Sequence, residues 1–270
     1  MKETQTFEYD SHKINEVKKC SRDIIYFVEN YVKIKSIANG EESLIVLYKK
    51  QREVLKTMSE SKKFCLEAAR QSGKTLLSQL YILWKCNFHE NSKCVMVSMT
   101  NCSCGLILSQ LEYFQSTIPD WLKCNAIYNS SRWTNENFIN FDNGSSIGFS
   151  TGSNFNPRGR NLSVLIFDEY SFYSELDPSF NNHGIRANNL EVLDIIKNSI
   201  ISTMEGQLIA TGTKAPGDSV FGLITKVGKG FTSWSREHMN WDDVPDRGLK
   251  WKDEMIECLG QKMFEQEFCV

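Results

Sequence analysis

The 270-residue chain lacks a strong charge excess and any long apolar run. Its 31 lysines and arginines face 33 aspartates and glutamates, so the formal net charge is −2. This balance argues against constitutive electrostatic binding of nucleic acid. It is compatible with transient binding, or with binding that is shared among subunits. The polar N-terminus lacks the apolar segment of a signal peptide, and no run is long enough to cross a bilayer. We therefore expect a soluble protein of the cytosol with no membrane partner.

Arrangements typical of metal ligands are also missing. The nine cysteines are odd in number, and several lie within apolar runs, which indicates reduced and mostly structural thiols. Cys102 and Cys104 form the only close pair, and without a second Cys or His pair they do not indicate a zinc site. The four histidines show no ligand spacing.

Apolar residues make up 41% and charged residues 24% of the chain, as in ordinary globular proteins. Apolar runs typical of strands alternate with amphipathic, helix-like segments, which indicates an α/β domain with a mainly parallel sheet flanked by helices. The predicted strands are 62–69, 93–99, 163–167, 207–213 and an edge strand at 231–237. The predicted helices are 14–32, 47–58, 76–88, 101–115, 190–201, 219–227 and 249–260.

Two smaller features complete the predicted organisation. Segments 137–142 and 145–152 alternate apolar and polar residues around Asp142-Asn143-Gly144, which predicts an antiparallel hairpin. The polar residues 39–43 are expected to form a turn between the first two helices. We predict a helical lead-in over residues 1–43 and one larger domain over 44–270.

The segment 68–75, AARQSGKT, contains the strongest motif, because a predicted strand leads into it and a predicted helix leaves it. Its end matches the phosphate-binding pattern G-x-x-x-x-G-K-[ST], although Ala68 replaces the first glycine. Gly73 lets the backbone approach phosphates closely, Lys74 supplies a positive charge for them, and Thr75 offers a hydroxyl to Mg²⁺. Arg70 is either a stabiliser of charge on the γ-phosphate or a plain surface arginine.

An acidic pair follows the buried apolar strand predicted at 163–167. In open α/β sheets, ligands bind beyond the carboxyl ends of the strands, where Asp168 and Glu169 would lie. Asp168 is the expected partner of Mg²⁺, either directly or through another ligand, and Glu169 is placed to act as a general base toward water. The alternative is a helix N-cap with Asp168 or Glu169 simply solvated. A GKT loop followed by a strand ending in Asp-Glu is more specific than either element alone.

Two further segments suit the same site less specifically. Thr211, Gly212 and Thr213 end a predicted buried strand, where the hydroxyls can sense a γ-phosphate or simply form a tight turn. Gln51 can hydrogen-bond an adenine edge with Tyr48 stacking nearby, although exposed residues of an amphipathic helix would look the same.

Together these stretches resemble the large terminase subunit of tailed phages over roughly residues 44–270. The matching stretches are Tyr48-x-x-Gln51, Arg70-Gln71-Ser72-Gly73-Lys74-Thr75, Pro157-Arg158-Gly159-Arg160, Leu165-Ile166-Phe167-Asp168-Glu169 and Ala210-Thr211-Gly212-Thr213. In that family the phosphate loop commonly contains an arginine and often lacks its first glycine, so the resemblance accounts for Arg70 and Ala68.

The resemblance implies a RecA-like P-loop NTPase fold of the ASCE type, with a strand inserted between the phosphate-loop strand and the acidic strand. It implies ATP and Mg²⁺ as ligands, with the nucleotide bound by Tyr48, Gln51, residues 70–75 and residues 211–213. Thr75 and Asp168 would bind the metal, and Glu169, Arg70 and Lys74 would serve catalysis. Residues 211–213 would also couple hydrolysis to movement.

The resemblance further implies a motor that drives double-stranded DNA into a procapsid in the host cytoplasm. Its expected partners are DNA, a portal protein, a small terminase subunit and further copies of the chain in a ring. Family members continue into a nuclease domain after a segment like 263–270, so we expect this chain to hydrolyse ATP without cutting DNA.

Two other functions fit parts of the pattern. A superfamily 2 helicase also has an upstream glutamine, a GKT loop and an Asp-Glu pair, but it needs a second RecA-like domain for which 270 residues leave no room. A nucleotide-sensing scaffold would bind ATP without useful turnover, and Glu169 argues against it because a binding-only site needs no base.

Overall fold

The computed structural model describes residues 10–36, 39–98, 100–130, 137–151, 161–169, 206–214 and 234–270. The main sheet contains β3 (Lys63–Ala68), β4 (Lys93–Ser98), β5 (Ala126–Ser130), β6 (Asn137–Phe141), β7 (Ser146–Thr151), β8 (Val164–Phe167), β9 (Gln207–Gly212) and β10 (Ser235–Met239). The α-helices are α1 (Ser11–Arg22), α2 (Ile24–Tyr31), α3 (Lys49–Glu60), α4 (Lys74–Phe88), α5 (Asn101–Thr117), α8 (Leu249–Leu259) and α9 (Gln261–Phe268). A short 3-10 helix, η3 (Trp241–Asp243), follows β10.

The strands of the main sheet lie in the order β10-β3-β9-β8-β4-β7-β6-β5. Every pairing from β10 across to β7 is parallel, whereas β6 and β5 are antiparallel additions. Strand β9 lies between β3 and β8, which confirms the inserted strand expected between the phosphate-loop strand and the acidic strand. The mainly parallel α/β architecture is confirmed with it.

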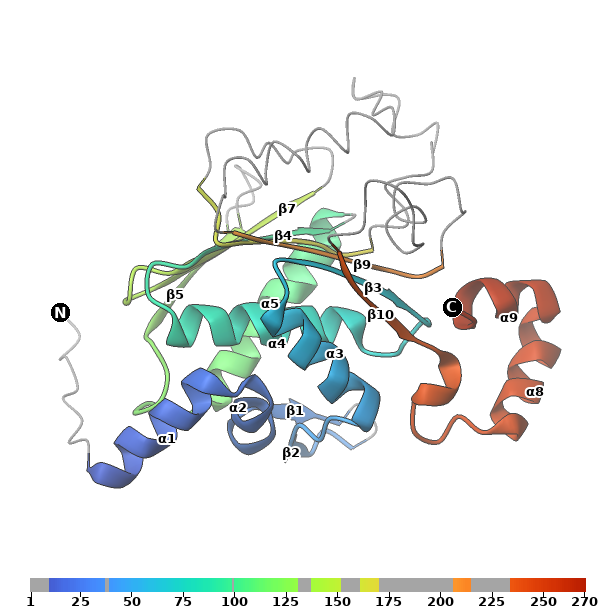
Figure 1. Ribbon diagram of the computed structural model, residues 1–270, viewed down its shortest axis with the longest axis horizontal. Coiled ribbons are helices and arrows are strands. Elements are labelled where there is room, and N and C mark those ends of the chain that lie inside the picture. Colours follow the sequence, from blue (N-terminus) through green and yellow to red (C-terminus); the bar gives the residue numbers. More distant parts are fainter. Residues whose placement is uncertain are drawn as a thin grey trace, which may run out of the picture.

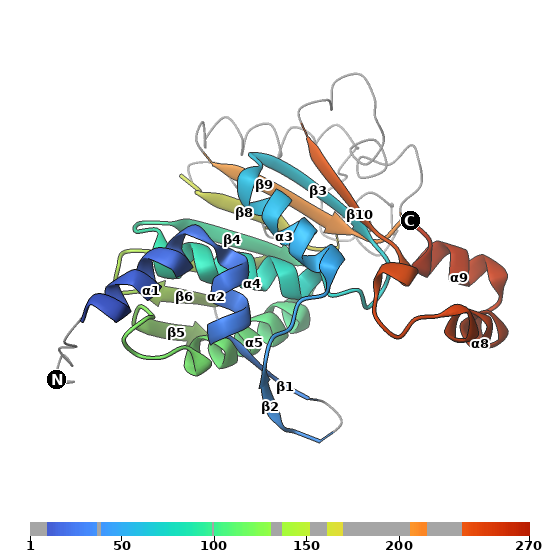
Figure 2. The same ribbon diagram turned by 60° about the horizontal axis from the view of Figure 1, so that its bottom comes forward.

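Helices α1 to α5 lie on one side of the sheet, and α8 and α9 form a separate pair near the end of β10 (Figures 1 and 2). The burial of each strand follows its sequence. All four residues of β8 are buried, as expected of a parallel strand covered on both faces, whereas β7 alternates buried and half-buried residues. Among the described residues, no helix has the length and apolar character to span a membrane.

The N-terminal region differs from its prediction. A single helix was expected over 14–32, but the chain forms α1 and α2 with a break at Asp23, whose backbone is extended (φ −132°, ψ 101°). The Asp23 carboxylate accepts hydrogen bonds from the N–H groups of Ile25 and Tyr26, which would otherwise lack partners at the start of α2. An N-cap therefore overrides the continuous apolar periodicity.

The turn predicted at 39–43 belongs to a small two-stranded hairpin, β1 (Lys33–Lys35) with β2 (Glu42–Leu44). This hairpin extends away from the main sheet (Figure 2). Three-residue strands with mostly exposed side chains carry almost no hydrophobic signal, so the sequence did not predict them. The helices predicted at 190–201 and 219–227 and the segment Pro157–Arg160 lie outside the described residues.

The predicted β-hairpin is confirmed, because β6 and β7 pair antiparallel across Asp142-Asn143-Gly144. Gly144 has a φ of +82°, and a Cβ there would lie 2.4 Å from Asn91 Oδ1. The turn thus needs glycine for its backbone conformation and for the close approach of Asn91.

We predict that Gly144→Ala lowers the free energy of unfolding by about 1–2 kcal/mol, because an L side chain is strained in the left-handed region. Urea denaturation measures the change. Gly105→Ala is the matched control: Gly105 lies within α5 and a Cβ there meets nothing within 4 Å. The control should be neutral or stabilising by up to about 1 kcal/mol. Equal losses in both variants would contradict the account of the turn.

Candidate nucleotide-binding site

The phosphate-binding motif lies between the end of β3 and the start of α4. Gly73 adopts a left-handed conformation (φ +92°), and a Cβ there would lie 2.5 Å from Gln51 Nε2. Position 68 does not need the glycine of the general motif, because Ala68 is still a buried residue of β3 in register with Met239 of β10. The first turn of α4 follows directly, so its free N–H groups lie where a phosphate anion is favoured.

Lys74, the first residue of α4, is buried, with 5% of its surface exposed. Its Nζ lies 2.9 Å from Glu169 Oε1, so the loop lysine and the proposed base form an ion pair. Glu169 adopts a left-handed backbone conformation (φ +56°) that is uncommon for this residue type. Its second carboxylate oxygen, Oε2, is buried and has no hydrogen-bond partner among the described residues.

Asp168, directly after β8, contacts the start of α4 and strand β9. Its carboxylate lies 3.0 Å from the hydroxyl of Thr75, at the start of α4, and accepts a 2.9 Å hydrogen bond from the hydroxyl of Thr211 on β9. Segments 70–75, 168–169 and 211 are therefore brought together at the carboxyl edge of the parallel strands, although about 90 residues separate the first from the second. Gly212 ends β9, and Thr213 directly after it is buried.

Burial raises the pKa of Asp168 to about 6, and the neighbouring charge of Glu169 adds to the rise. The hydroxyl of Thr211, the charge of Lys74 and the hydroxyl of Thr75 oppose it. The site thus holds a buried carboxyl beside a second acidic group, and a cation bound there would stabilise its ionised form.

The residues present fit Mg²⁺ bound together with a nucleotide. Carboxylate and hydroxyl oxygens, as on Asp168 and Thr75, are ligands that this hard cation prefers. Among the described residues, no group of three or more His, Cys, Asp or Glu is placed to hold a metal. Mg²⁺ commonly uses one or two protein oxygens and completes its shell with water and substrate phosphates, so this sparse set is suited to it.

Tyr48 and Gln51 lie against the phosphate loop. The Tyr48 hydroxyl donates to the carbonyl oxygen of Ser72 at 2.5 Å, and Gln51 Nε2 donates to the same oxygen at 3.1 Å. Their predicted contact with adenine stays a prediction. What the geometry adds is that both side chains also support the loop, which the sequence did not suggest.

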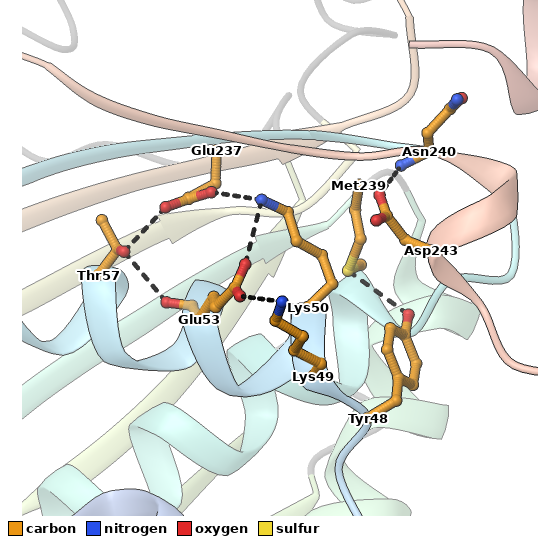
Figure 3. A network of polar contacts seen from close by, with 9 residues as sticks. All are labelled: Tyr48, Lys49, Lys50, Glu53, Thr57, Glu237, Met239, Asn240 and Asp243. Atoms are coloured by element: carbon orange, nitrogen blue, oxygen red, sulfur yellow. Dashed lines mark hydrogen bonds and ion pairs between the residues drawn. The ribbon is translucent and has the colours of Figure 1, made fainter.

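Helix α3, which contains Gln51 and directly follows Tyr48, is attached to the edge strand β10 (Figure 3). Lys50 Nζ lies 2.8 Å from Glu237 Oε2, and the Thr57 hydroxyl donates to the other oxygen of that carboxylate. The Tyr48 hydroxyl also lies 3.5 Å from Met239 Sδ. These contacts fix the start of α3 beside the loop.

The C-terminal helix pair contacts the other side of the loop. Arg70 Nη1 lies 3.2 Å from Glu267 Oε2 of α9, and 62% of the Arg70 side chain is exposed. Arg247, just before α8, donates to the carbonyl oxygens of Arg70 and Gln71. Arg247 and Glu267 could not be predicted from sequence, because they lie more than 170 residues from the loop and outside any motif.

The large terminase of bacteriophage HK97 superimposes with a TM-score of 0.68 at 13% identity over 92% of this chain and 54% of that one. The large terminase of a thermophilic bacteriophage superimposes with a TM-score of 0.59 at 16% sequence identity, over 83% of this chain and 53% of that one. For the large terminase ATPase domain of Thermus phage P74-26 the TM-score is 0.51 at 17% sequence identity, over 80% of this chain and 91% of that one.

The fold is that of a phage large terminase ATPase domain. This confirms the RecA-like architecture implied by the sequence resemblance. The chain spans about half the length of the two longer terminases and nearly all of the P74-26 ATPase domain. No protein-family model matches the sequence.

The raised pKa of Asp168 predicts a pH dependence of stability in metal-free buffer. A group with a folded-state pKa near 6 and an ordinary value of 3.8 contributes stability that is present below about pH 4 and lost as pH rises to about 6. The loss is on the order of 3 kcal/mol. Because Asp168→Asn cannot titrate, its stability relative to wild type should improve by roughly that amount between pH 4 and pH 7.

Chemical denaturation with EDTA present, at half-unit pH intervals, measures this difference. Since both proteins share every other titrating group, the difference reports Asp168 together with its electrostatic coupling to Glu169 and Lys74. A constant offset across the whole range would show that the Asp168 pKa is not raised by burial.

Proposed function

We propose that the chain is the ATPase motor of a viral large terminase, which hydrolyses ATP to drive double-stranded DNA into a procapsid. The observation that supports this most is the meeting of Lys74 with Glu169, and of Thr75 and Thr211 with Asp168, at one edge of the sheet. In the thermophilic-phage terminase of the same fold, complexes with ADP and with ATP-gamma-S have been solved, which supports nucleotide binding here.

In this proposal the loop residues bind the triphosphate. The N–H groups of Gly73 and of the first turn of α4 favour the phosphate anions, and Gln71, Ser72 and Gly73 provide the close backbone approach. Lys74 exchanges its contact with Glu169 for the β- and γ-phosphates. Mg²⁺, held by Thr75 and Asp168, would neutralise charge on the phosphate oxygens.

Release from Lys74 frees the Glu169 carboxylate to accept a proton from the attacking water. With its uncommon backbone conformation, Glu169 directs its side chain to Lys74. Arg70 reaches a phosphate after leaving Glu267, and its exposure leaves it free to do so on its own nucleotide or on a neighbour's.

The remaining roles follow the resemblance. Tyr48 and Gln51 contact adenine while supporting the loop. Residues 211–213 sense the γ-phosphate, and their movement when it is lost is transmitted to β9. Thr211 is suited to this because its hydroxyl hydrogen-bonds the Asp168 carboxylate. A portal protein, a small terminase subunit and a ring of identical chains would complete the motor in the host cytoplasm.

We predict that Lys74→Ala lowers ATP turnover at least a hundredfold, because a neutral side chain cannot hold the γ-phosphate. Phosphate release at saturating ATP and Mg²⁺ measures it. Lys18→Ala is the control, since Lys18 is an exposed residue of α1 away from the loop. Turnover within a few-fold of wild type in Lys74→Ala would overturn the assignment of the site.

Glu169→Gln separates hydrolysis from binding in the same assay. The amide keeps the size of the side chain but accepts no proton, so nucleotide affinity should persist while turnover is lost. A wild-type protein that binds ATP but turns over no faster than Glu169→Gln would instead support the nucleotide-sensing scaffold.

A further inference from the structure

The phosphate loop is held from outside by hydrogen bonds to three consecutive carbonyl groups. Arg247 Nη1 donates to the carbonyl oxygen of Arg70 at 3.2 Å, and Nη2 donates to that of Gln71 at 3.1 Å. The carbonyl oxygen of Ser72 accepts from Tyr48 and Gln51. Two unrelated parts of the chain, α3 and the segment before α8, therefore hold the same short loop.

Because the peptide unit is planar, these hydrogen bonds also orient the N–H groups of the loop. In a trans peptide the C=O and the following N–H point in opposite directions. A carbonyl held toward Arg247 or toward α3 therefore turns the N–H of the next residue the other way. The three held carbonyls orient the N–H groups of Gln71, Ser72 and Gly73. That of Ser72 donates to the carbonyl oxygen of Ala69, whereas those of Gln71 and Gly73 belong to the part of the loop that would receive phosphate.

The loop needs such support because its backbone is strained. Gln71 has a φ of +58°, a left-handed conformation uncommon for a residue with a side chain. Conformations of this kind are strained and persist only where surrounding structure enforces them. A guanidinium that donates to the carbonyls on both sides of the Gln71 Cα provides that enforcement.

Arg247 is itself firmly placed. Its guanidinium lies 4.6 Å from the ring centre of Trp251 and 5.8 Å from that of Phe268. The backbone N–H of Arg247 donates to the carbonyl oxygen of Val244. Both rings belong to the apolar cluster of the C-terminal helix pair, which also packs on Ala69 at the start of the loop. Stacking fixes the plane of the guanidinium, so its two donors are aligned before any nucleotide binds.

We propose that Arg247 is a positioning residue, which keeps the phosphate loop in its nucleotide-receiving conformation and connects the α8–α9 pair to nucleotide binding. This rests on the proposed ATPase function for its effect on nucleotide. Its effect on the loop itself does not. Arg247 touches no reacting atom in this proposal, so its loss weakens nucleotide binding more than it slows hydrolysis of bound ATP.

The test compares Arg247→Gln and Arg247→Lys with wild type. The glutamine variant removes the charged fork and is expected to raise the Kd for ADP and the KM for ATP about tenfold to a hundredfold, with kcat within about threefold. A lysine reaches one carbonyl rather than two, so Arg247→Lys should recover only part of the affinity. The matched control is Lys252→Gln, because Lys252 lies 5.6 Å from the Trp241 ring of the same cluster and has no contact with the loop among the described residues.

A second measurement is independent of nucleotide. Amide hydrogen exchange of the ligand-free protein should be at least tenfold faster in the segment 69–75 for Arg247→Gln, and unchanged there for Lys252→Gln. Exchange and affinity equal to wild type in a folded Arg247→Gln variant would overturn the proposal, as would equal changes in Lys252→Gln. Wild-type protein that binds no nucleotide would overturn the ATPase function instead, while the exchange result still decides the role of Arg247.

Discussion

The buried carboxylate of Asp168 joins three chain segments that the sequence keeps far apart. It follows β8, lies against the Thr75 hydroxyl at the start of α4, and accepts a hydrogen bond from Thr211 of β9. Burying an ionised group costs free energy unless the group is hydrogen-bonded or charge-compensated. The raised pKa of Asp168 reflects this cost of burial. The strands, the loop and the proposed cation site all depend on this carboxylate being placed where a positive charge can stabilise it.

The order of the strands explains how this arrangement arises. Insertion of β9 between β3 and β8 places Thr211 beside Asp168 while leaving Lys74 within reach of Glu169. On the outer side of β3, the edge strand β10 anchors α3 through Glu237, and α3 in turn supports the loop. The chain that follows β10 then returns to the loop through Arg247 and α9. The phosphate loop is thus supported by two separate parts of the chain, the start of α3 and the segment that follows β10.

Much of this could be predicted from sequence, because local patterns encode it. The continuous apolar run of β8, the alternation in β6 and β7 and the spacing of Gly73, Lys74 and Thr75 each follow from one segment of chain. The combination of the loop with Asp168 and Glu169 pointed to a shared cleft, and the structure brings these residues together. The family resemblance supplied the inserted strand, which no local pattern could show.

The features that sequence did not predict depend on local capping or on long-range contacts. The N-cap at Asp23 divides one apolar periodicity into two helices, and the β1–β2 hairpin is too short and exposed to give a signal. Arg247 and Glu267 belong to no motif and reach the loop only through the packing of Trp251, Phe264 and Phe268. The support of Ser72 by Gln51 depends on the packing of α3 against the loop, which the sequence of neither segment shows.

A crystal structure with Mg²⁺ and a non-hydrolysable ATP analogue tests the central claim most directly. The account predicts that the triphosphate lies along residues 70–75, with Lys74 Nζ on the γ-phosphate, the Thr75 hydroxyl on the metal and Glu169 released from Lys74. A nucleotide bound elsewhere, or a Lys74–Glu169 ion pair that persists beside the bound nucleotide, would contradict it.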